Sequence, residues 1–515
     1  MRSSRPRIPL RLSLALVALH ILLAGPCQPA DITGVPSPER RLAVPITTAV
    51  APDARFTPIR TELIESVRRG KFPSISIAVI DDGKTVWEES IGWSDREQHV
   101  AATRSTAYLL ASLGKSVTAS AVMRLVDQHR IDLAAPIDRY FGDAALTMHA
   151  GDRSAVTVAR VLDMTAEIPH GGLSFLSEKD ANAYTSSTLV RNRGIVVFPP
   201  GTIAMYSNMN YGIVEQMLAT VSGRSFRSFM HEVFFAPLGM QHSWVGPNRA
   251  GGARHYSSDG KLLPPSFNRP ESSLAMYMSL DDLVRYARMH LDLARPRYLQ
   301  PDTLKMMQTH SSGVEHAPLA LGIGNIGLSD GSQFLLTNGR AGGAQSTLGM
   351  FPRQRSAVIC LINATGGASD DIAFRIADLL HPGFAREIHD KIAEHEAWAD
   401  HPYAPGADDY GTWRGTIENR ATTLPIELEF QRDGDVHVRI AKQPETLVKL
   451  AFHDGLISGR FIAEVPAEIE PGHAHPVTIS LLRSGDRLSG FLTSGFENER
   501  GSFSLASYVT LSKAP

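Results

Sequence analysis

The order of strand-like and helical segments constrains the fold of this chain more than any other feature. An apolar run at residues 74–80 precedes Asp-Asp-Gly-Lys and a second apolar stretch, which is the pattern of a β-hairpin. Helical periodicity then dominates from Leu110 to about Arg297. Strand-like runs return later, at Phe334–Leu336, Thr347–Phe351 and Ser356–Asn363, before a closing helix at Asp371–Leu380. Strands at both ends with helices between them predict one α+β domain, over residues 56–384, whose sheet joins early and late strands.

The pattern changes again after residue 408. Short alternating strands separated by turns continue from Tyr410 to Leu511, as in Ile426, Leu428 and Phe430. We therefore expect a separate antiparallel β-barrel or sandwich domain at residues 409–515. No group of chemically reactive residues stands out in it.

Two connecting segments flank the α+β domain. Residues 31–55 contain several prolines and little periodicity, and we expect a linker. Residues 385–408 are charged and contain three histidines, His389, His395 and His401. Because their spacing lacks the H-E-x-x-H pattern, a solvated linker helix is favoured over a zinc site.

The first 30 residues have the layout of a secretory signal peptide. Several arginines precede an apolar run from about Leu12 to Ala24, and small residues follow up to Ala30. The expected location is the periplasm or the exterior, with no membrane span after cleavage. Cys27 suggests a lipoprotein, but Pro26 occupies the place of the small residue that should precede a lipidated cysteine. The other cysteine, Cys360, then has no partner for a disulfide.

Composition excludes some classes of partner. The chain has 515 residues, of which 43% are hydrophobic and 20% charged, and its formal net charge is −2. This is ordinary for a globular protein, and no excess of basic charge points to nucleic acid or an anionic membrane. We expect a small-molecule or short-peptide substrate, no metal and no cofactor, and the sequence does not indicate an oligomeric state.

Ser112 and Lys115 form the motif S-x-x-K. A serine hydroxyl is a weak nucleophile that needs an adjacent base. If a helix begins at the serine, the two residues share a face, and burial favours a neutral lysine amine able to accept the serine proton. The motif also occurs by chance, since Ser258 and Lys261 repeat it around an Asp-Gly turn. Only Ser112 is followed by an apolar helical pattern, which favours it over an ordinary helix cap.

Tyr206 and Asn208 provide a second polar pair, in a loop before a helical pattern at Ile213–Val221. A tyrosine beside a lysine can act as a general base. Asn208 can donate to a substrate carbonyl or to the lysine. A buried tyrosine with a satisfied hydroxyl remains the alternative for Tyr206 alone.

Three other kinds of site are excluded by the sequence. The segment Leu113-Gly114-Lys115-Ser116 imitates the end of a phosphate-binding loop, but Leu109 stands where that motif needs glycine. No G-x-S-x-G sequence of an α/β-hydrolase is found. No cluster of metal-ligating residues is found either.

Taken together, these segments resemble the serine β-lactamase-related family over about residues 60–380. The similar branch contains class C β-lactamases, family VIII esterases and D-aminopeptidase-like hydrolases. The segments that carry the resemblance occur in the family's order: Pro73–Val79, Ser112–Lys115, Ile131–Ile137, Val161–Thr165, Tyr206–Asn208 and Pro237–Met240. The resemblance implies a β-lactamase/transpeptidase-like sheet flanked by a helical region.

The same resemblance implies roles for the polar residues. Ser112 is then the acylated nucleophile, Lys115 its partner, and Tyr206 the general base that also protonates the leaving group, while Asn208 positions the substrate. The family's third element, K-T-G or H-x-G, is altered, and its counterpart here is Asn338–Ala344.

In this counterpart, Arg340 stands in the place of the lysine or histidine. If Arg340 points inward it can bind a substrate carboxylate bidentately, and if outward a neutral ester is favoured. Gly342 and Gly343 allow close backbone approach, and the Gly343 N–H is expected to form an oxyanion hole with the Ser112 N–H.

Two functional interpretations remain open. The first is an exported serine hydrolase that forms an acyl-Ser112 intermediate from an ester, a D-amino-acid peptide or amide, or a β-lactam. The second is a catalytically inactive binding or regulatory protein on the same fold. It is supported by the altered third element and by Ala166-Glu167, which stands in place of the family's usual small polar pair. The segment Ile168–Val196 has no readable structure, so the size of the pocket is not predicted.

Overall fold

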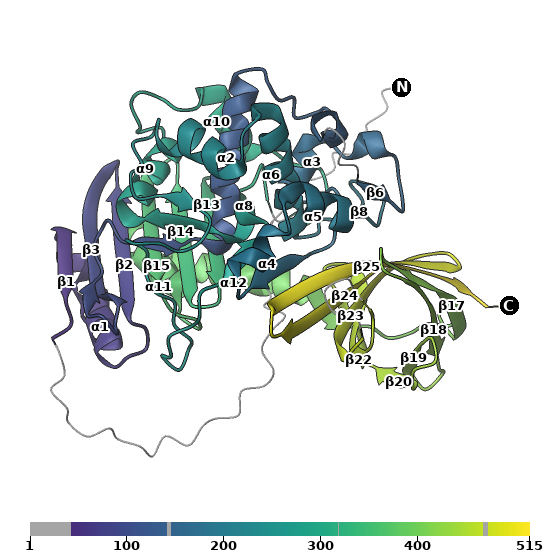
Figure 1. The fold of residues 1–515 in the computed structure, drawn as a ribbon. Helices are drawn as coiled ribbons and strands as arrows, with labels where there is room; N and C mark the ends of the chain where they lie inside the picture. Colours follow the sequence, from purple (N-terminus) through teal and green to yellow (C-terminus); the bar gives the residue numbers. More distant parts are fainter. Residues whose placement is uncertain (1–42, 142–145, 318, 467–471, 515) are drawn as a thin grey trace, which may run out of the picture.

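The computed structural model describes residues 43–141, 146–317, 319–466 and 472–514 (Figure 1). The predicted signal peptide and Cys27 lie outside the described residues. The α+β architecture is confirmed, with a β-lactamase/transpeptidase-like mixture of helices and sheet followed by a C-terminal antiparallel sheet. No helix in the described ranges is long and apolar enough to cross a membrane.

An antiparallel sheet forms the base of the larger domain. Its order is β1-β3-β2-β15-β14-β13-β12, with β4 on β3. The strands are β1 (Ile46–Val50), β2 (Ser74–Asp81), β3 (Lys84–Asp95), β4 (Val100–Ala101), β12 (Gly324–Gly327), β13 (Gln333–Ala341), β14 (Ala344–Phe351) and β15 (Ser356–Ile362). The predicted hairpin is β2–β3, and early β2 pairs with late β15, as expected from the sequence.

One expectation about the N-terminal side is wrong. Residues 31–55 are not a linker throughout, because Ile46–Val50 forms β1 and pairs with β3 at the edge of the sheet. This strand is largely exposed on both faces. It therefore lacks the apolar alternation by which a strand is recognised, and the nearby prolines favoured a linker.

Apolar residues cover both faces of the sheet. On β2, Ile75, Ile77 and Val79 pack into one buried cluster, and Ala78 and Ile80 pack into another. This alternation follows from the two-residue period of a strand. The first cluster is covered by α1 (Thr57–Arg68), α11 (Ser369–Leu380) and α12 (Phe384–Ala399).

The other face carries the helical region, seen above the sheet in Figure 1. Its central helix is α2 (Gly114–Asp127), and all but three of its residues are buried. Around it lie α3 (Val158–Leu162), α4 (Glu178–Asn182), α5 (Ser186–Arg193), α6 (Asn208–Ser222), α7 (Phe226–Phe229), α8 (Glu271–Leu274), α9 (Leu280–His290) and α10 (Pro301–Thr309). Short strands complete it: β5 (Ala107–Leu109), β6 (Thr147–Met148), β8 (Ile195–Val196), β9 (Trp244–Val245) and β11 (Met276–Ser279).

The C-terminal domain is one curled antiparallel sheet, a half-barrel rather than a sandwich. Its path is β16-β21-β22-β23-β24-β25-β17-β18-β19-β20. The strands are β16 (Asp400–Pro402), β17 (Gly411–Glu418), β18 (Thr423–Phe430), β19 (Val436–Ile440), β20 (Thr446–Val448), β21 (Leu450–His453), β22 (Leu456–Ala463), β23 (His475–Ser484), β24 (Arg487–Asn498) and β25 (Gly501–Lys513). Its buried face is centred on Trp413, Leu428 and Ile479.

The two domains share a sheet. Strands β7 (Gly172–Phe175) and β10 (Phe267–Arg269) belong to the helical region by sequence, yet β7 pairs with β25 and β10 pairs with β7. In Figure 1 the long β24–β25 hairpin accordingly reaches toward α4. The predicted linker region contains most of α12, which carries His389 and His395, and β16, which carries His401. The three side chains contact different aromatic rings instead of one another.

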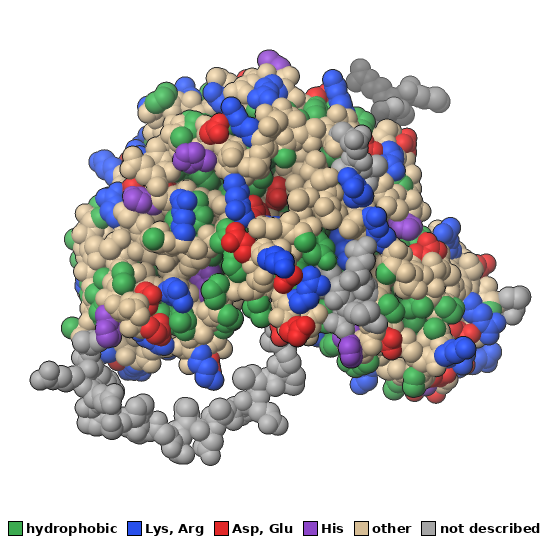
Figure 2. Space-filling view, viewed as in Figure 1, with side chains coloured by type: hydrophobic (Ala, Val, Ile, Leu, Met, Phe, Trp, Pro, Cys, Tyr) green, Lys and Arg blue, Asp and Glu red, His purple; other side chains and the backbone are tan. Residues whose placement is uncertain are grey.

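On the face shown in Figure 2, basic and acidic side chains are interspersed over both domains. This mixture agrees with the formal net charge of −2.

Burial of Trp87 gives a test of the sheet core. Trp87 on β3 is 0% exposed and stacks on Phe56 at a ring-centroid distance of 5.5 Å. We expect Trp87→Ala to lower the free energy of unfolding by about 3–5 kcal/mol, through lost burial and a cavity. Val100→Ala, at a side chain 51% exposed, is the control and should change it by less than about 0.5 kcal/mol. The free energies of unfolding of both variants are measured by urea unfolding, with far-UV circular dichroism as a signal that does not depend on tryptophan. Equal effects of the two substitutions would contradict the assignment of Trp87 to the core.

Candidate active site

Ser112 lies where a strand turns into the central helix. Strand β5 leads into a 3-10 turn at Ala111–Leu113, and α2 begins at Gly114. Ala111 has φ of +48°, a left-handed conformation that is uncommon for a residue with a Cβ. Such local strain is typical of functional sites. The turn places Ser112 one helical turn before Lys115.

Three side-chain atoms meet at this point. Lys115 Nζ lies 2.9 Å from Ser112 Oγ and 2.6 Å from Tyr206 OH. The Tyr206 hydroxyl donates in turn to Ser112 Oγ at 2.7 Å. Tyr206, which is 91 residues after Lys115 in the chain, therefore closes a triangle of hydrogen bonds with the two residues of the S-x-x-K motif.

Burial controls the protonation of this triangle. Lys115 is 2% exposed, and its burial lowers its pKa well below the usual value of an amine. Burial raises the pKa of Tyr206 above that of a free phenol, and the hydrogen bond to Ser112 opposes this in part. Both shifts favour the uncharged forms, so burial favours Lys115 as an amine with a free electron pair.

Tyr206 is held by the loop before α6. The Met205 N–H donates to the Met164 carbonyl at 2.9 Å, immediately before the tyrosine. Immediately after it, the Ser207 hydroxyl donates to the Pro169 carbonyl at 2.8 Å and accepts from the Met209 N–H as the helix cap. Two backbone anchors thus fix the position of the phenol.

Asn208 lies beside a histidine that the sequence did not single out. Asn208 is 6% exposed, and its Nδ2 lies 3.4 Å from Nε2 of His170. The His170 ring stacks near Tyr206 at a centroid distance of 6.1 Å. Burial, and then the nearby Lys115, lower the pKa of His170 to about 4, so the ring is neutral. His170 belongs to the segment without readable periodicity, and a lone histidine there carried no signal.

The sheet meets the nucleophile at Gly339 on β13. A Cβ built on Gly339 would lie 1.9 Å from the Leu110 carbonyl oxygen and 2.7 Å from the Ser112 nitrogen. Only glycine permits this approach. The Ser346 hydroxyl on β14 also donates to the Leu110 carbonyl, at 2.7 Å. The sequence prediction used the later glycines instead, although Gly-Gly between two strands is itself a hairpin-turn signal.

The prediction for Gly342 and Gly343 is wrong. They form the two-residue turn between β13 and β14. The Gly343 N–H donates to Thr365 Oγ1 at 2.7 Å, and a Cβ on Gly343 would lie 2.4 Å from that of His255. The Gly343 N–H is therefore engaged at the hairpin tip and does not form an oxyanion hole with Ser112.

The sequence left open whether the Arg340 side chain points into the site or away from it, and the structure shows that it points away. Arg340 follows Gly339, so its side chain lies on the opposite face of β13 from Ser112. There it forms an ion pair with Asp370 at 2.6 Å, and Asn338 donates to the same carboxylate at 3.0 Å. The Asp370 carboxylate, at the start of α11, thereby holds β13 in place through both side chains.

Glu167 supports the loop that leads to Tyr206. Its carboxylate accepts from the N–H groups of Thr202 and Ile203 at 3.0 and 2.9 Å. Glu167 is 0% exposed and has φ of +61°. Burial raises its pKa to about 8 despite these hydrogen bonds. From the sequence alone, Glu167 was only a departure from the family pattern.

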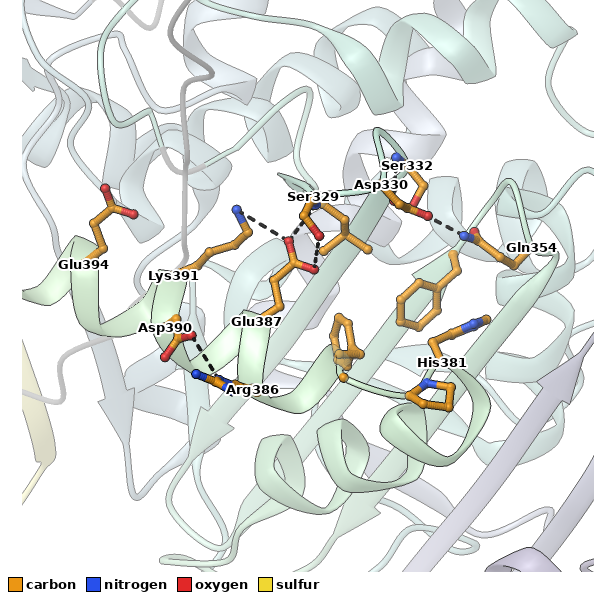
Figure 3. Close-up of a pocket in the computed structure, with 15 residues that line it drawn as sticks. Ser329, Asp330, Ser332, Gln354, His381, Arg386, Glu387, Asp390, Lys391 and Glu394 are labelled. Atoms are coloured by element: carbon orange, nitrogen blue, oxygen red, sulfur yellow. Dashed lines mark hydrogen bonds and ion pairs between the residues drawn. The ribbon is translucent and has the colours of Figure 1, made fainter.

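A surface cavity of about 590 Å³ lies elsewhere, between the start of α12 and the β12–β13 turn (Figure 3). In its lining, Glu387 accepts from the Ser329 N–H and lies 3.8 Å from Lys391. No residue of the Ser112 triangle lines it. In the described ranges, no group of three or more His, Cys, Asp or Glu side chains is placed to hold a metal ion.

The fold and this constellation define the class of protein, that of the β-lactamase-related proteins. A model of the family described as "Beta-lactamase" matches residues 59–381, which is more than half of the chain. The chain therefore belongs to the beta-lactamase family, as its sequence segments indicated.

Similar proteins of known name cover different parts of the chain. The unguisins hydrolase ungD of Aspergillus violaceofuscus is 27% identical over 205 residues, which are 38% of this chain and 36% of that protein. The chain thus spans well under half the length of this curated relative.

Two solved structures share the fold over most of the chain. The octameric penicillin-binding protein homologue of Pyrococcus abyssi has a TM-score of 0.54 at 20% identity, covering 87% of this chain and 99% of that one. SurE has a TM-score of 0.57 at 20% identity, covering 90% and 99%.

The position of Arg340 gives one prediction. Because its side chain lies on the face of β13 away from Ser112, we expect Arg340→Ala to change hydrolysis of a neutral ester by less than about threefold. The exposed ion pair contributes about 0–1 kcal/mol to stability. Steady-state kinetics and thermal unfolding of Arg340→Ala measure the two effects. A loss of activity approaching that of Ser112→Ala would contradict the outward orientation.

The raised pKa of Glu167 gives a second prediction. Between the unfolded pKa near 4.5 and the folded value of about 8, the folded state keeps a proton that the unfolded state has lost. Glu167 therefore stabilises the fold below pH 4.5, and this contribution is lost as pH rises through 8, at up to about 1.4 kcal/mol per pH unit.

We expect Glu167→Gln to flatten the fall of stability over this pH range relative to the wild type. Melting temperatures in matched buffers at several pH values test this. Glu315→Gln, at a side chain 88% exposed, is the control. Parallel pH curves for wild type and Glu167→Gln would show that Glu167 does not titrate in this range.

Proposed function

We propose that this protein hydrolyses an uncharged ester or small amide through an acyl-Ser112 intermediate. The observation that carries the proposal is the triangle in which Ser112 Oγ, Lys115 Nζ and Tyr206 OH lie within 2.6–2.9 Å of one another. It supports an active enzyme over an inactive binding protein, because a buried lysine with a lowered pKa is costly in a site that performs no proton transfer.

In the acylation step, Ser112 Oγ attacks the carbonyl carbon of the substrate. Its proton passes to the neutral Lys115 amine, directly or through the Tyr206 hydroxyl. As the tetrahedral intermediate collapses, Tyr206 O–H protonates the leaving oxygen or nitrogen, and Lys115 returns a proton to Tyr206. A water molecule then attacks the acyl group, its proton passes to the same pair, and Ser112 Oγ is regenerated with release of the acid.

Two backbone N–H groups are suited to stabilise the oxyanion. Ala341 and Ala344 flank the two-residue turn as a hydrogen-bonded pair, so Arg340 opposite Gln345 is a non-hydrogen-bonded pair. The Arg340 N–H therefore points away from β14, toward the edge where Gly339 contacts Ser112. We assign the oxyanion hole to the N–H groups of Arg340 and Ser112, in place of Gly343.

The charges around the site favour a neutral acyl group. Arg340 is paired with Asp370 on the far face of β13, and His170 is neutral. Lys115, the basic side chain that contacts Ser112, is needed as an uncharged base. A substrate carboxylate, as in a penicillin or a free peptide terminus, would thus enter without a cation to bind it.

Relatives support hydrolysis in general but do not distinguish the substrates. The fungal relative is named a hydrolase, and a structural neighbour is described as a penicillin-binding protein homologue. An amide or D-amino-acid peptide without a free carboxylate near the scissile bond is therefore the second candidate, and a β-lactam the third.

A reporter ester tests the proposal. We expect p-nitrophenyl acetate to be hydrolysed by the wild type and only at the background rate by Ser112→Ala. Lys115→Arg should lose at least about a hundredfold, because a guanidinium cannot accept the proton. The pH profile of the wild type should rise through a pKa well below 10.5, set by Lys115.

Intact-protein mass spectrometry provides the substrate comparison. An activated neutral ester should leave an acyl adduct on the Ser112 peptide faster than a penicillin does. Equal ester hydrolysis by wild type and Ser112→Ala would refute the enzyme proposal. Faster acylation by penicillin would refute the preference for neutral substrates.

A further inference from the structure

We propose that strand β25 of the C-terminal domain positions Tyr206 and His170, so that this domain is a working part of the catalytic site. The inference rests on the proposed acyl-Ser112 chemistry. Residues around Gly501 contact the segment that carries His170, and residues around Tyr508 contact the segment that carries Tyr206. Through these contacts the C-terminal domain has a positioning role.

The first contact lies at the start of β25. Its residues Gly501–Ser504 pair with β7 in register, from Gly501 opposite Phe175 to Ser504 opposite Gly172. The pairing continues at the Leu176 N–H, which donates to the Arg500 carbonyl at 2.9 Å. Gly172 is only two residues after His170, so the backbone of β25 fixes the end of the loop that carries His170.

The space beside His170 is closed by the same strand. A Cβ on Gly171 would lie 3.4 Å from the Ser504 carbonyl oxygen. Residues Ser504, Leu505 and Ala506 line one side of a small cavity whose other side includes His170 and Met209. The wall behind His170 is therefore built in part from the C-terminal domain.

The second contact lies farther along β25, at Tyr508. An apolar cluster joins the two domains there and consists of Val197, Phe198, Met205, Leu456, Phe491 and Tyr508. The Tyr508 ring also stacks on His149 at a centroid distance of 4.0 Å and an interplanar angle of 12°. Met205 directly precedes Tyr206, so the packing of Tyr508 supports the backbone from which the phenol projects.

One strand thus supports both segments that flank the Lys115 amine. Ser504 and Tyr508 are four residues apart on β25, which corresponds to about 13 Å along a strand. The hydrogen bonds of Tyr206 to Ser112 and Lys115 measure 2.7 and 2.6 Å, and displacement by about 1 Å can cost roughly a hundredfold in rate. A C-terminal domain that only stabilised the fold would not affect the turnover of folded enzyme.

The test removes the Tyr508 contact in the full-length protein. We expect Tyr508→Ala to lower kcat for p-nitrophenyl acetate by roughly tenfold or more while KM changes less than about twofold. Tyr508→Phe keeps the ring and should restore the wild-type rate. The matched control is Leu511→Ala, because Leu511 lies on the same strand, is 1% exposed and packs only into the C-terminal core.

A second variant tests the first contact. A Cβ on Gly501 would lie 1.9 Å from the Ser174 carbonyl oxygen, so Gly501→Ala should displace β25 from β7 and also lower kcat. Circular dichroism and melting temperature establish that each variant is folded at the assay temperature. If Tyr508→Ala does not fold, Tyr508→Leu retains most of the buried volume without the ring stacking and takes its place.

The outcomes separate the two proposals. Folded Tyr508 and Gly501 variants with the wild-type kcat would overturn the positioning role and leave the acyl-Ser112 chemistry standing. A loss in Leu511→Ala equal to that in Tyr508→Ala would also overturn it, because the effect would then follow the stability of the domain. Absence of Ser112-dependent turnover in the wild type would overturn both.

Discussion

The site depends on the close approach of β13 to the turn at Ser112. Gly339 lies so near the Leu110 carbonyl and the Ser112 nitrogen that no side chain fits between strand and turn. This contact joins the sheet to the helical region at the nucleophile itself. It also determines the face of β13 on which each neighbouring side chain lies, and thereby places the Arg340 side chain away from the site.

The proton chemistry follows from this arrangement. The sheet edge and the surrounding helices bury Lys115, and burial favours the uncharged form of its amine. The same environment raises the pKa of Tyr206, so burial favours the uncharged forms of both groups beside Ser112. Proton transfer among the three groups then requires no nearby ion, which agrees with the uncharged acyl group that we propose as the substrate.

Much of the site could be predicted from the sequence, because it rests on local patterns. The Ser112–Lys115 spacing on a helix, the position of Tyr206 before α6, and the strands around residues 74–87 and 334–363 all follow from periodicity and turn residues. The glycine contact was assigned to the wrong residues, since only the register of β13 with β14 shows which glycine faces Ser112. His170 and β1 were missed because a lone histidine and an exposed edge strand produce no apolar pattern.

The pairing of β7 with β25 has a consequence for the order of events during synthesis. Strand β25 leaves the ribosome roughly 330 residues after β7, which at 5–20 residues per second is a delay of about 15–65 seconds. Until then β7 has an unpaired edge, and the segment preceding Tyr206 lacks the packing of Tyr508. The nucleophile and its lysine are therefore made early, whereas their alignment waits for the last strand, so the growing chain carries Ser112 for most of its synthesis without a finished site.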